Sequence, residues 1–204
     1  SNADPRLKET EFRVACDVSN PLTGKNGASA VYGPQKGAMP ADVELLDTAL
    51  GRLAEVVSSQ LGENKAELPG AGAAGGLGYG LTIFCGASLE TGIDIVLDAA
   101  NFEERIEGVD LVITGEGKID GQTAYGKVPI GVARRAKKHG VPVLVIAGDI
   151  GDGIEGVYEA GIDAVMSTVN RAMSLEEAMS RGHELLVDAS ERAMRMVRLG
   201  FGLC

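Results

Sequence analysis

The sequence is poor in cysteine, histidine and positive charge, and each shortage excludes a class of protein. The three cysteines, Cys16, Cys85 and Cys204, lie far apart and form no C-x-x-C pair. An odd number of isolated cysteines argues against a disulfide framework or a zinc site and favours a reducing cytoplasm. The formal net charge is −10, which argues against a nucleic-acid partner. His139 and His183 fall on predicted helices, where we expect surface residues rather than catalysts.

Long apolar runs are also missing. No stretch approaches eighteen uninterrupted apolar residues, so we expect no membrane span, and the first residues are too polar for a secretory signal. We interpret Ser1-Asn2-Ala3 as a cloning remnant. The sequence shows no internal repeat and no low-complexity segment, and its 45% hydrophobic and 24% charged residues are typical of a globular protein.

Glycine is the residue in excess, with 29 copies gathered in a few loops. Glycine-rich loops let backbone amides approach a ligand closely. Because the overall negative charge repels anions, an anionic substrate would need a local cluster of lysines and backbone N–H groups.

The first half of the chain mixes irregular segments with helices. The sequence predicts a strand at residues 12–18 and a helix at residues 41–61 that ends at Gly62. A buried helix is expected at about residues 73–85. Ser88 is expected to cap another helix that runs to about Ala100, with Glu90 in its first turn.

The second half alternates regularly. Strands are predicted at residues 109–114, 141–147 and 164–168, and helices at 129–139, 154–160 and 174–199, the last capped by Ser174 with Glu177 at the box position. Such alternation predicts an α/β protein with a doubly wound parallel sheet and helices on both faces. The apolar face of the last helix is predicted to comprise Leu175, Met179, Leu186, Ala189, Ala193 and Val197. A domain boundary is expected near residues 101–108.

The loop predicted after Thr114 carries the strongest chemical signal. In an open parallel sheet, ligands bind beyond the carboxyl ends of the strands. Phosphoryl transfer needs carboxylates for metal, cations for phosphates and accessible backbone N–H groups. The loop offers all three, although a solvated connection remains the alternative: Gly115, Glu116, Gly117, Lys118, Asp120, Gln122, Thr123 and Lys127.

Residues 121–128 read Gly-Gln-Thr-Ala-Tyr-Gly-Lys-Val, which nearly matches a phosphate-binding P-loop. Val128 stands where a Ser or Thr should hold magnesium, and six residues separate the motif from Thr114. The match is therefore a near miss. Lys127 can still reach a phosphate from the start of the following helix.

Two further segments are candidates, each with a structural alternative. Gly70, Gly72 and Gly75 fit G-x-G-x-x-G, which indicates either anion-binding amides or tight helix packing, and only weakly a nicotinamide-dependent dehydrogenase. Asp17 ends a predicted strand, and Asn20 is either a ligand or a turn former. Gln35 and Lys36 lie between glycines, where the lysine is either an anion ligand or an exposed side chain. Asp149 and Asp152 follow a predicted strand and could line the site, although they are better explained as turn residues.

Three segments in combination resemble the bacterial glycerate kinase family. They are residues 15–24 (Ala-Cys-Asp-Val-Ser-Asn-Pro-Leu-Thr-Gly) with residues 33–37 (Gly-Pro-Gln-Lys-Gly), residues 69–76, and residues 109–123 with Gly126 and Lys127. The resemblance covers residues 11–200. It implies transfer of the γ-phosphoryl group of ATP, with Mg²⁺, to D-glycerate, giving 2-phosphoglycerate in many members.

The resemblance also implies two α/β domains, one flavodoxin-like and one inserted into it. Residues 4–107 would form the later part of the inserted domain, and residues 108–204 the C-terminal part of the flavodoxin-like domain. From residue chemistry we assign Asp17 or Asp120 to the glycerate hydroxyl, Glu116 and Asp120 to the metal, and Lys36 and Lys127 to phosphate or carboxylate. The other predicted substrate or phosphate contacts are Asn20, Gln35, Gly70, Gly72, Gly75, Gly115, Gly117, Gln122 and Thr123.

The family is about twice as long as this chain, and two of its glycine-rich signatures are absent here. The sequence is therefore expected to be a partial kinase that is inactive alone, or else a non-catalytic module that binds anions or nucleotides. Incomplete sheets would leave exposed edges through which a homodimer can form.

Overall fold

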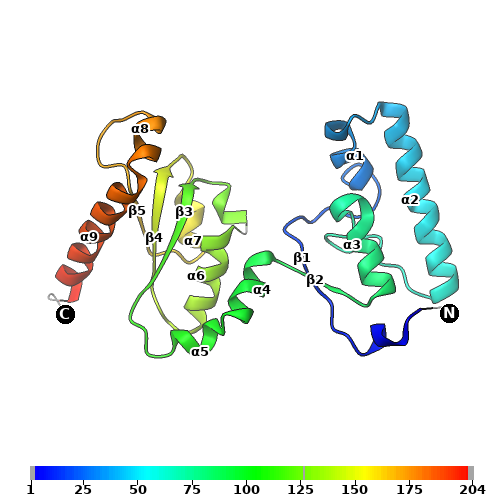
Figure 1. Ribbon diagram of the computed structural model, residues 1–204, viewed down its shortest axis with the longest axis horizontal. Helices are drawn as coiled ribbons and strands as arrows, with labels where there is room; N and C mark the ends of the chain where they lie inside the picture. Colours follow the sequence, from blue (N-terminus) through cyan, green and yellow to red (C-terminus); the bar gives the residue numbers. More distant parts are fainter. Residues whose placement is uncertain (1–2, 126, 202–204) are drawn as a thin grey trace. The chain divides into compact units, whose positions relative to one another are not determined.

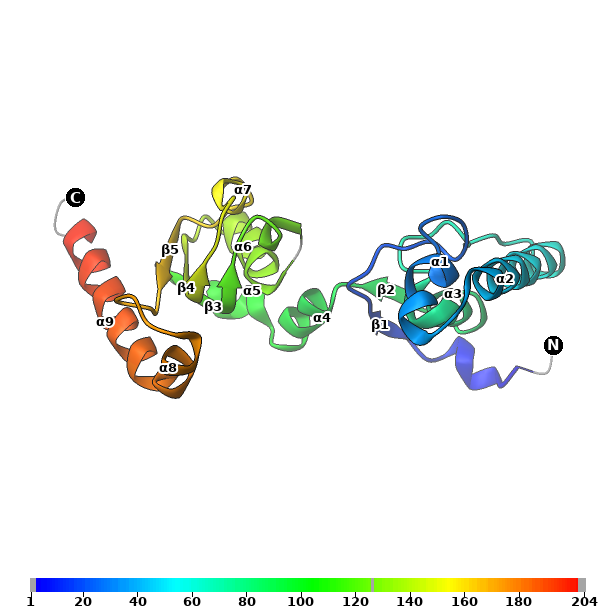
Figure 2. The ribbon, with the colours of Figure 1, turned by 90° about the horizontal axis from the view of Figure 1, so that it is seen from above.

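The computed structural model describes residues 3–125 and 127–201. The chain divides into two compact units, one up to Ile95 and the other from Val96 onward (Figures 1 and 2). Among the described residues, no helix is both long and apolar enough to cross a bilayer.

The first unit is mainly helical (Figure 1). The predicted helix at residues 41–61 is confirmed as α2; it starts at Pro40, a favourable first position, and ends before Gly62, whose φ of 73° closes the helix. The helix expected at about residues 73–85 is also confirmed. The elements are η1 (Pro5–Lys8), β1 (Arg13–Ala15), α1 (Ala28–Tyr32), η2 (Pro34–Lys36), α2 (Pro40–Leu61), α3 (Ala73–Phe84) and β2 (Ser88–Glu90).

The helix predicted to start at Ser88 is wrong in its first turn. Ser88–Glu90 forms β2, which pairs in parallel with β1, and Arg13 of β1 binds the Glu90 carboxylate. The following helix, α4 (Gly92–Ala99), starts after Thr91, whose hydroxyl accepts a hydrogen bond from the Asp94 N–H. Pairing with a strand 75 residues earlier overrides the local capping signal, because it satisfies the backbone groups of Ser88–Glu90.

The core of the first unit is small and centres on Tyr79, which is fully buried among Leu22, Ala54, Val57 and other apolar residues. In the described part of the chain, the Tyr79 hydroxyl has no hydrogen-bond partner. A buried hydroxyl without a partner costs stability, because it loses its hydrogen bond to water on folding.

We therefore expect Tyr79→Phe to leave the free energy of unfolding unchanged or raise it by up to about 1 kcal/mol. Tyr32→Phe is the matched control, because the Tyr32 hydroxyl donates a 2.6 Å hydrogen bond to Asn20 Oδ1. That substitution should lower stability by about 0.5–1.5 kcal/mol. Urea unfolding of both variants measures the difference, and a Tyr79→Phe variant that is clearly less stable than the parent would contradict the prediction.

The second unit contains a three-stranded parallel sheet in the order β3-β4-β5, as the alternating pattern predicted. The β3 strand extends further than expected, from Val112 to Ile119. The elements are α5 (Phe102–Ile106), β3 (Val112–Ile119), η3 (Thr123–Tyr125), α6 (Val128–Lys138), β4 (Val143–Ile150), α7 (Glu155–Glu159), β5 (Ala164–Ser167), α8 (Leu175–Ser180) and α9 (Gly182–Phe201).

Helices cover both faces of this sheet. Val143, Val145 and Ala147 of β4 share a core with residues of α6 and α7. Leu144 and Ile146, on the opposite face, pack against α9. Such alternation along β4 explains why its sequence is apolar throughout, since both faces of the strand are buried.

The long helix predicted at residues 174–199 is in fact two helices. Ser174 caps α8 as predicted, by accepting a hydrogen bond from the Glu177 N–H, but α8 ends at Ser180 and Arg181 separates it from α9. Arg181 instead binds both Glu177 and Glu184, one on each side of the break. The break also changes the buried face of α9, in which Leu185 is buried and Leu186 is 48% exposed. Ala189 and Ala193 are buried as predicted, whereas Leu175 and Met179 are exposed.

Arg135 of α6 binds residues of α4 and α5 that lie, like α6, in the second unit. Its side chain is 9% exposed, lies 2.6 Å from Asp98, binds Glu103, and sits 6.0 Å from the Phe102 ring centroid. The guanidinium holds the pKa of Glu103 below its ordinary value, mainly through the hydrogen bonds that it donates. Because the folded pKa is lowered, this pair stabilises the fold above the ordinary glutamate pKa and loses its effect as pH falls through the lower, folded value.

Glu103→Gln should therefore flatten the loss of thermal stability on acidification below about pH 4.5. The expected change is a smaller drop in melting temperature between neutral pH and pH 3 than in the parent. Glu104→Gln, at the next position of α5, is the control and should retain the parent's pH dependence. Equal pH dependence in Glu103→Gln and the parent would contradict the assignment.

Candidate functional site

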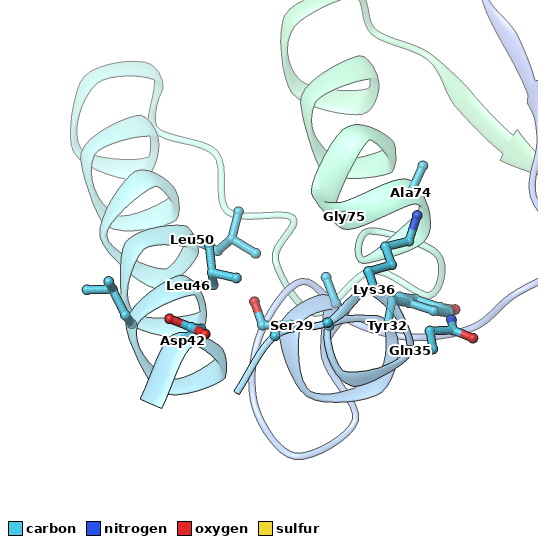
Figure 3. Close-up of a pocket in the computed structure, with 14 residues that line it drawn as sticks. Ser29, Tyr32, Gln35, Lys36, Asp42, Leu46, Leu50, Ala74 and Gly75 are labelled. Atoms are coloured by element: carbon cyan, nitrogen blue, oxygen red, sulfur yellow. The ribbon is translucent and has the colours of Figure 1, made fainter. Parts of the chain in front are cut away.

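Two groups of predicted residues come together, one in each unit. The first surrounds an open pocket of about 940 Å³ between α1, η2, the start of α2 and the start of α3 (Figure 3). It contains the predicted residues Gln35, Lys36 and Gly75. The lining is Ala28, Ser29, Tyr32, Gly33, Gln35, Lys36, Gly37, Ala38, Asp42, Leu45, Leu46, Leu50, Ala74 and Gly75.

Asn20 shapes this pocket without lining it. Its side-chain amide donates to the Asn26 carbonyl at 2.8 Å, and its side-chain oxygen accepts from the Tyr32 hydroxyl. Its backbone carbonyl accepts a hydrogen bond from the Gly72 N–H at 2.9 Å. Asn20 thus fixes the position of Tyr32 in the pocket wall. This structural role accounts for the asparagine at this position without a direct contact to a ligand.

Gln35 and Lys36 lie in η2, between Gly33 and Gly37, and both side chains are exposed. Lys36 extends toward Ala74 and Gly75 (Figure 3). No ion pair involves Lys36 within the part of the chain that the structure describes, so its ammonium group is available to an anion.

The glycine-rich turn before α3 owes its first glycines to packing. A Cβ on Gly72 would lie 2.2 Å from the Pro21 carbonyl oxygen, and the Gly72 N–H is already bound to Asn20. A Cβ on Gly70 would lie 2.7 Å from Cys16 Sγ. These contacts favour the packing explanation for Gly70 and Gly72 over the ligand-binding one.

Ala74 and Gly75, at the start of α3, line the pocket instead. Ala74, Gly75 and Gly76 all have left-handed backbone conformations, with φ of 50°, 75° and 97°. This conformation costs an alanine about 1–2 kcal/mol. Strain of this kind is typical of binding sites.

Asp17, the candidate carboxylate of the first unit, is exposed and does not line the pocket. Its Oδ1 accepts a 2.8 Å hydrogen bond from the Gly92 N–H at the start of α4. The structure therefore gives Asp17 a local role at this helix start, and its catalytic role stays a prediction.

In the second unit, the loop predicted after Thr114 is wrong over its first half, because β3 continues to Ile119. Gly115, Glu116, Gly117 and Lys118 are strand residues paired with or flanking β4 partners. Pairing with the equally long β4 explains the extension, since glycine and charged residues have low strand preference on their own.

The extended backbone separates two proposed metal ligands. At about 3.3 Å per residue, the Cα atoms of Glu116 and Asp120 are about 13 Å apart. Two carboxylates on that spacing cannot readily share one ion at Mg²⁺ distances of about 2.1 Å. The structure thus does not bring Glu116 and Asp120 together, and at most one of them would hold a given metal ion.

Asp120 lies instead with Lys118 and Asp149 at the carboxyl ends of β3 and β4. Lys118 Nζ is 4.0 Å from Asp120 Oδ2 and 3.9 Å from Asp149 Oδ2. The two strands lie very close together here. A Cβ atom added to Gly148 would lie only 2.5 Å from the Gly117 carbonyl oxygen. We call Lys118, Asp120 and Asp149 the strand-end cluster.

The turn after β3 is closed by its own side chains. Asp120 Oδ1 accepts from the Gln122 N–H at 3.0 Å, and the Thr123 hydroxyl accepts from the Asp120 N–H at 3.1 Å. Thr123 is fully buried, which favours a structural role, whereas Gln122 is exposed. Lys127 is exposed at the start of α6, and Gly126 of the near-miss P-loop lies outside the described residues.

The donor set of the strand-end cluster fits a phosphate-bound magnesium ion better than a protein-enclosed one. No group of three or more potential metal ligands occurs among the described residues. Mg²⁺ in kinases is usually held by one or two carboxylates together with substrate phosphates and water. Asp120 and Asp149 supply two carboxylates, and Lys118 supplies a cation for phosphate.

Sequence reasoning missed some of the groups that the structure brings together. Lys118 was named among the loop residues but received no role of its own, and its two-residue spacing from Glu116 and Asp120 is the period of a strand. Asp149 was assigned to a turn. Ser29, Tyr32 and Asp42 line the pocket from two separate elements, and no local sequence motif marks them.

Comparisons with known proteins place these features in a family. The family model for the glycerate kinase family matches residues 1–198, which is nearly the whole chain. The chain belongs to the glycerate kinase family.

Individual relatives agree with this assignment. A glycerate kinase of Halalkalibacterium halodurans is 54% identical over 190 residues, which are 93% of this chain and 50% of the relative. A glycerate 2-kinase of Escherichia coli K12 is 48% identical over 98% of this chain and 52% of the relative. The chain therefore spans about half the length of the curated relatives that it matches.

A solved structure gives the same result for the fold. The crystal structure of a candidate glycerate kinase 2 from Salmonella typhimurium LT2 superposes with a TM-score of 0.80 at 46% identity. The match covers 98% of this chain and 51% of that one.

Two substitutions in the glycine-rich segment compare the stability cost of a steric overlap with that of a left-handed backbone conformation. Gly72→Ala should destabilise the fold by about 3 kcal/mol or more, because the added methyl group meets rigid backbone. Gly75→Ala should cost only about 1–2 kcal/mol, since its left-handed φ is strained but its Cβ would have no neighbour within 4 Å. Urea denaturation of both variants measures the two costs, and equal costs would contradict the distinction.

Proposed function

We propose that this chain supplies the phosphoryl-transfer groups for ATP-dependent phosphorylation of glycerate, with 2-phosphoglycerate as the product. The observation that carries the proposal is the strand-end cluster, in a chain that belongs to the glycerate kinase family. The name of the Escherichia coli relative, a glycerate 2-kinase, supports the position of phosphorylation.

The cluster suits the chemistry of a kinase. During transfer, negative charge spreads over the oxygens of the γ-phosphoryl group, and a cation with a bound metal stabilises it. Lys118 can neutralise part of that charge, while Asp120 and Asp149 would hold Mg²⁺, which would supply further positive charge to the phosphoryl group. A carboxylate oxygen of Asp120 can alternatively take the proton of the attacking glycerate hydroxyl.

Lys127 is the second cation of this unit. It lies at the start of α6, an eleven-residue helix whose N-terminus favours anions. We therefore keep Lys127 as a phosphate ligand in the proposal. The flavodoxin-like identity of this unit and the inserted-domain identity of the other are part of the same proposal.

A chimera tests the function while supplying the length that the relatives possess. The matching segment of the Halalkalibacterium halodurans glycerate kinase is replaced by this chain. We expect ATP- and Mg²⁺-dependent phosphorylation of D-glycerate, removed by EDTA and restored by Mg²⁺, and measured by coupled ADP release with the product identified by NMR.

In that chimera, Asp120→Asn should lower kcat by about 100-fold or more. Asp152→Asn is the control, because Asp152 is exposed and follows the same strand without joining the cluster. A folded chimera with no turnover would overturn the kinase proposal. An Asp120→Asn chimera as active as the Asp152→Asn control would overturn the role of the cluster.

A further inference from the structure

The side of α9 that points away from the sheet has an unusual composition. Leu185, Ala189 and Ala193 form the buried side of the helix. Val187 and Met194, on the outward side, are 55% and 46% exposed. The helix lies at a border of the second unit, where it contacts β4, β5 and α8 (Figures 1 and 2). Two exposed apolar residues alone would be normal on a surface, so their meaning depends on their spacing and their neighbours.

The outward side of α9 follows the spacing of helices that pack against other helices. Val187 and Met194 are seven residues apart, and charged residues occupy the remaining positions of a 3-4 repeat. Every member of this stripe is exposed. We call it the outer face of α9, and its members are Glu184, Val187, Glu191, Met194 and Arg198.

The charges of α9 are separated by sign along the helix. The helix dipole accounts for Glu184 in the first turn and Arg198 in the last turn, but its effect fades within one turn and does not explain a change of sign in the middle of the helix. A helix with an acidic half and a basic half attracts a second copy of itself in the antiparallel orientation and repels it in the parallel one. The charged residues, in chain order, are Glu184, Asp188, Glu191, Arg192, Arg195 and Arg198.

Ion pairs within α9 leave these charges available to a partner. Arg195 lies 2.6 Å from Glu191, and Arg192 lies 3.0 Å from Asp188. Such pairs form equally well when the signs alternate along a helix, so they do not require the separation. Exposed pairs contribute only about 0–1 kcal/mol, so a second copy can compete for them. Arg198 has no ion-pair partner among the residues that the structure describes.

We infer that the outer face of α9 binds a second copy of this chain, with the two α9 helices antiparallel. Such a contact is symmetric, and its two-fold axis passes near the middle of the stripe. An axis between Ser190 and Glu191 places Val187 opposite Met194 of the second copy. The two apolar residues are then covered at the centre of the contact. This surface is distinct from the sheet edges that the sequence suggested for a homodimer.

The same axis brings opposite charges together at both ends of the stripe. Glu184 lies beside Arg198 of the second copy, and the symmetry repeats this pair. The two Glu191 side chains lie near the axis, where Arg195 of the same helix neutralises each of them. A single pair of helices is a small interface, so the dimer is expected to be weak.

Sedimentation velocity of this chain over about 5–500 µM tests the inference. We expect a reversible equilibrium between monomer and dimer, with a dissociation constant on the order of 10–100 µM, because the interface is small. Raising NaCl from about 50 to about 500 mM should weaken the dimer about fivefold, because salt screens exposed charges. A chain that stays monomeric throughout would overturn the inference.

Charge reversal tests the antiparallel pairing. An acidic variant combines Arg195→Glu with Arg198→Glu, and a basic variant combines Glu184→Lys with Glu191→Lys. Each variant alone should dimerise about tenfold more weakly than the parent, because both ends of the stripe then carry like charges. An equimolar mixture of the two variants should form dimers at least as well as the parent. A mixture that stays monomeric, with both variants folded, would contradict the pairing.

Two control variants carry the same changes of net charge on exposed residues of the first unit. They are Lys25→Glu with Arg52→Glu, and Glu44→Lys with Glu55→Lys. Both should dimerise like the parent, and circular dichroism of every variant establishes that the helices are retained. If the controls weaken the dimer as much as the α9 variants do, net charge alone controls association and the inference is wrong.

A further variant tests the apolar centre without changing the charge. Val187→Gln with Met194→Gln should weaken the dimer about tenfold, because the centre of the contact loses its apolar cover. Leu45→Gln with Leu61→Gln, at exposed positions of α2, is its control and should dimerise like the parent. Unchanged dimerisation of the α9 variant would place the contact elsewhere on the chain.

The kinase chimera shows whether the outer face of α9 stays available in a protein of the relatives' length. We expect the chimera to dimerise, and the acidic and the basic changes each to weaken that dimer. A monomeric chimera would mean that the added half covers α9, and it would overturn the inference. Phosphorylation of glycerate by the chimera is measured separately, so the proposed function stands or falls independently of the dimer.

Discussion

The hydrogen bond from the Gly72 N–H to the Asn20 carbonyl is the contact on which the first unit depends. It holds the turn before α3 against the segment that follows β1, so closely that a methyl group on Gly72 would overlap the Pro21 backbone. The same Asn20 fixes Tyr32 through its side chain. One backbone approach therefore positions α1, the start of α3 and the pocket between them.

A similar constraint operates in the second unit, where Gly148 lets β4 approach the Gly117 carbonyl of β3 near the carboxyl ends of the two strands. The strand-end cluster lies just beyond this contact. In both units, glycine acts first by permitting close backbone packing, and the polar groups are positioned as a result. An excess of glycine in such a sequence is thus a sign of how the site is built and not only of what it binds.

The sequence predicted the regular elements well because their signals are local. Pro40 and Gly62 bound α2, Ser174 caps α8, and the apolar run of β4 identifies a strand buried on both faces. The failures have a common cause in long-range pairing. Ser88 joins β1 instead of capping a helix, and Gly115–Lys118 form a strand because β4 lies beside them.

The candidate site could be predicted only in part, because long-range packing brings some of its residues together. Lys36, Gly75 and Asp120 occur in motifs and were identified, whereas Ser29 and Asp42 meet only because α1 and α2 pack around one pocket. The proposed pairing of Glu116 with Asp120 placed both residues in one loop, and the strand separates them. Residue chemistry can identify candidate metal ligands, but backbone conformation decides which of them can bind the same metal ion.

The pairing of β1 with β2 has a further consequence for how the chain folds. These strands are only three residues long and lie 75 residues apart in the sequence, whereas each strand of the other sheet pairs with the next strand along the chain. Folding is slow when a long loop must be closed, at a cost in entropy, before stabilising contacts can form. The three-stranded sheet is therefore expected to form early, and the short parallel pair, with the segments that it anchors, to form last.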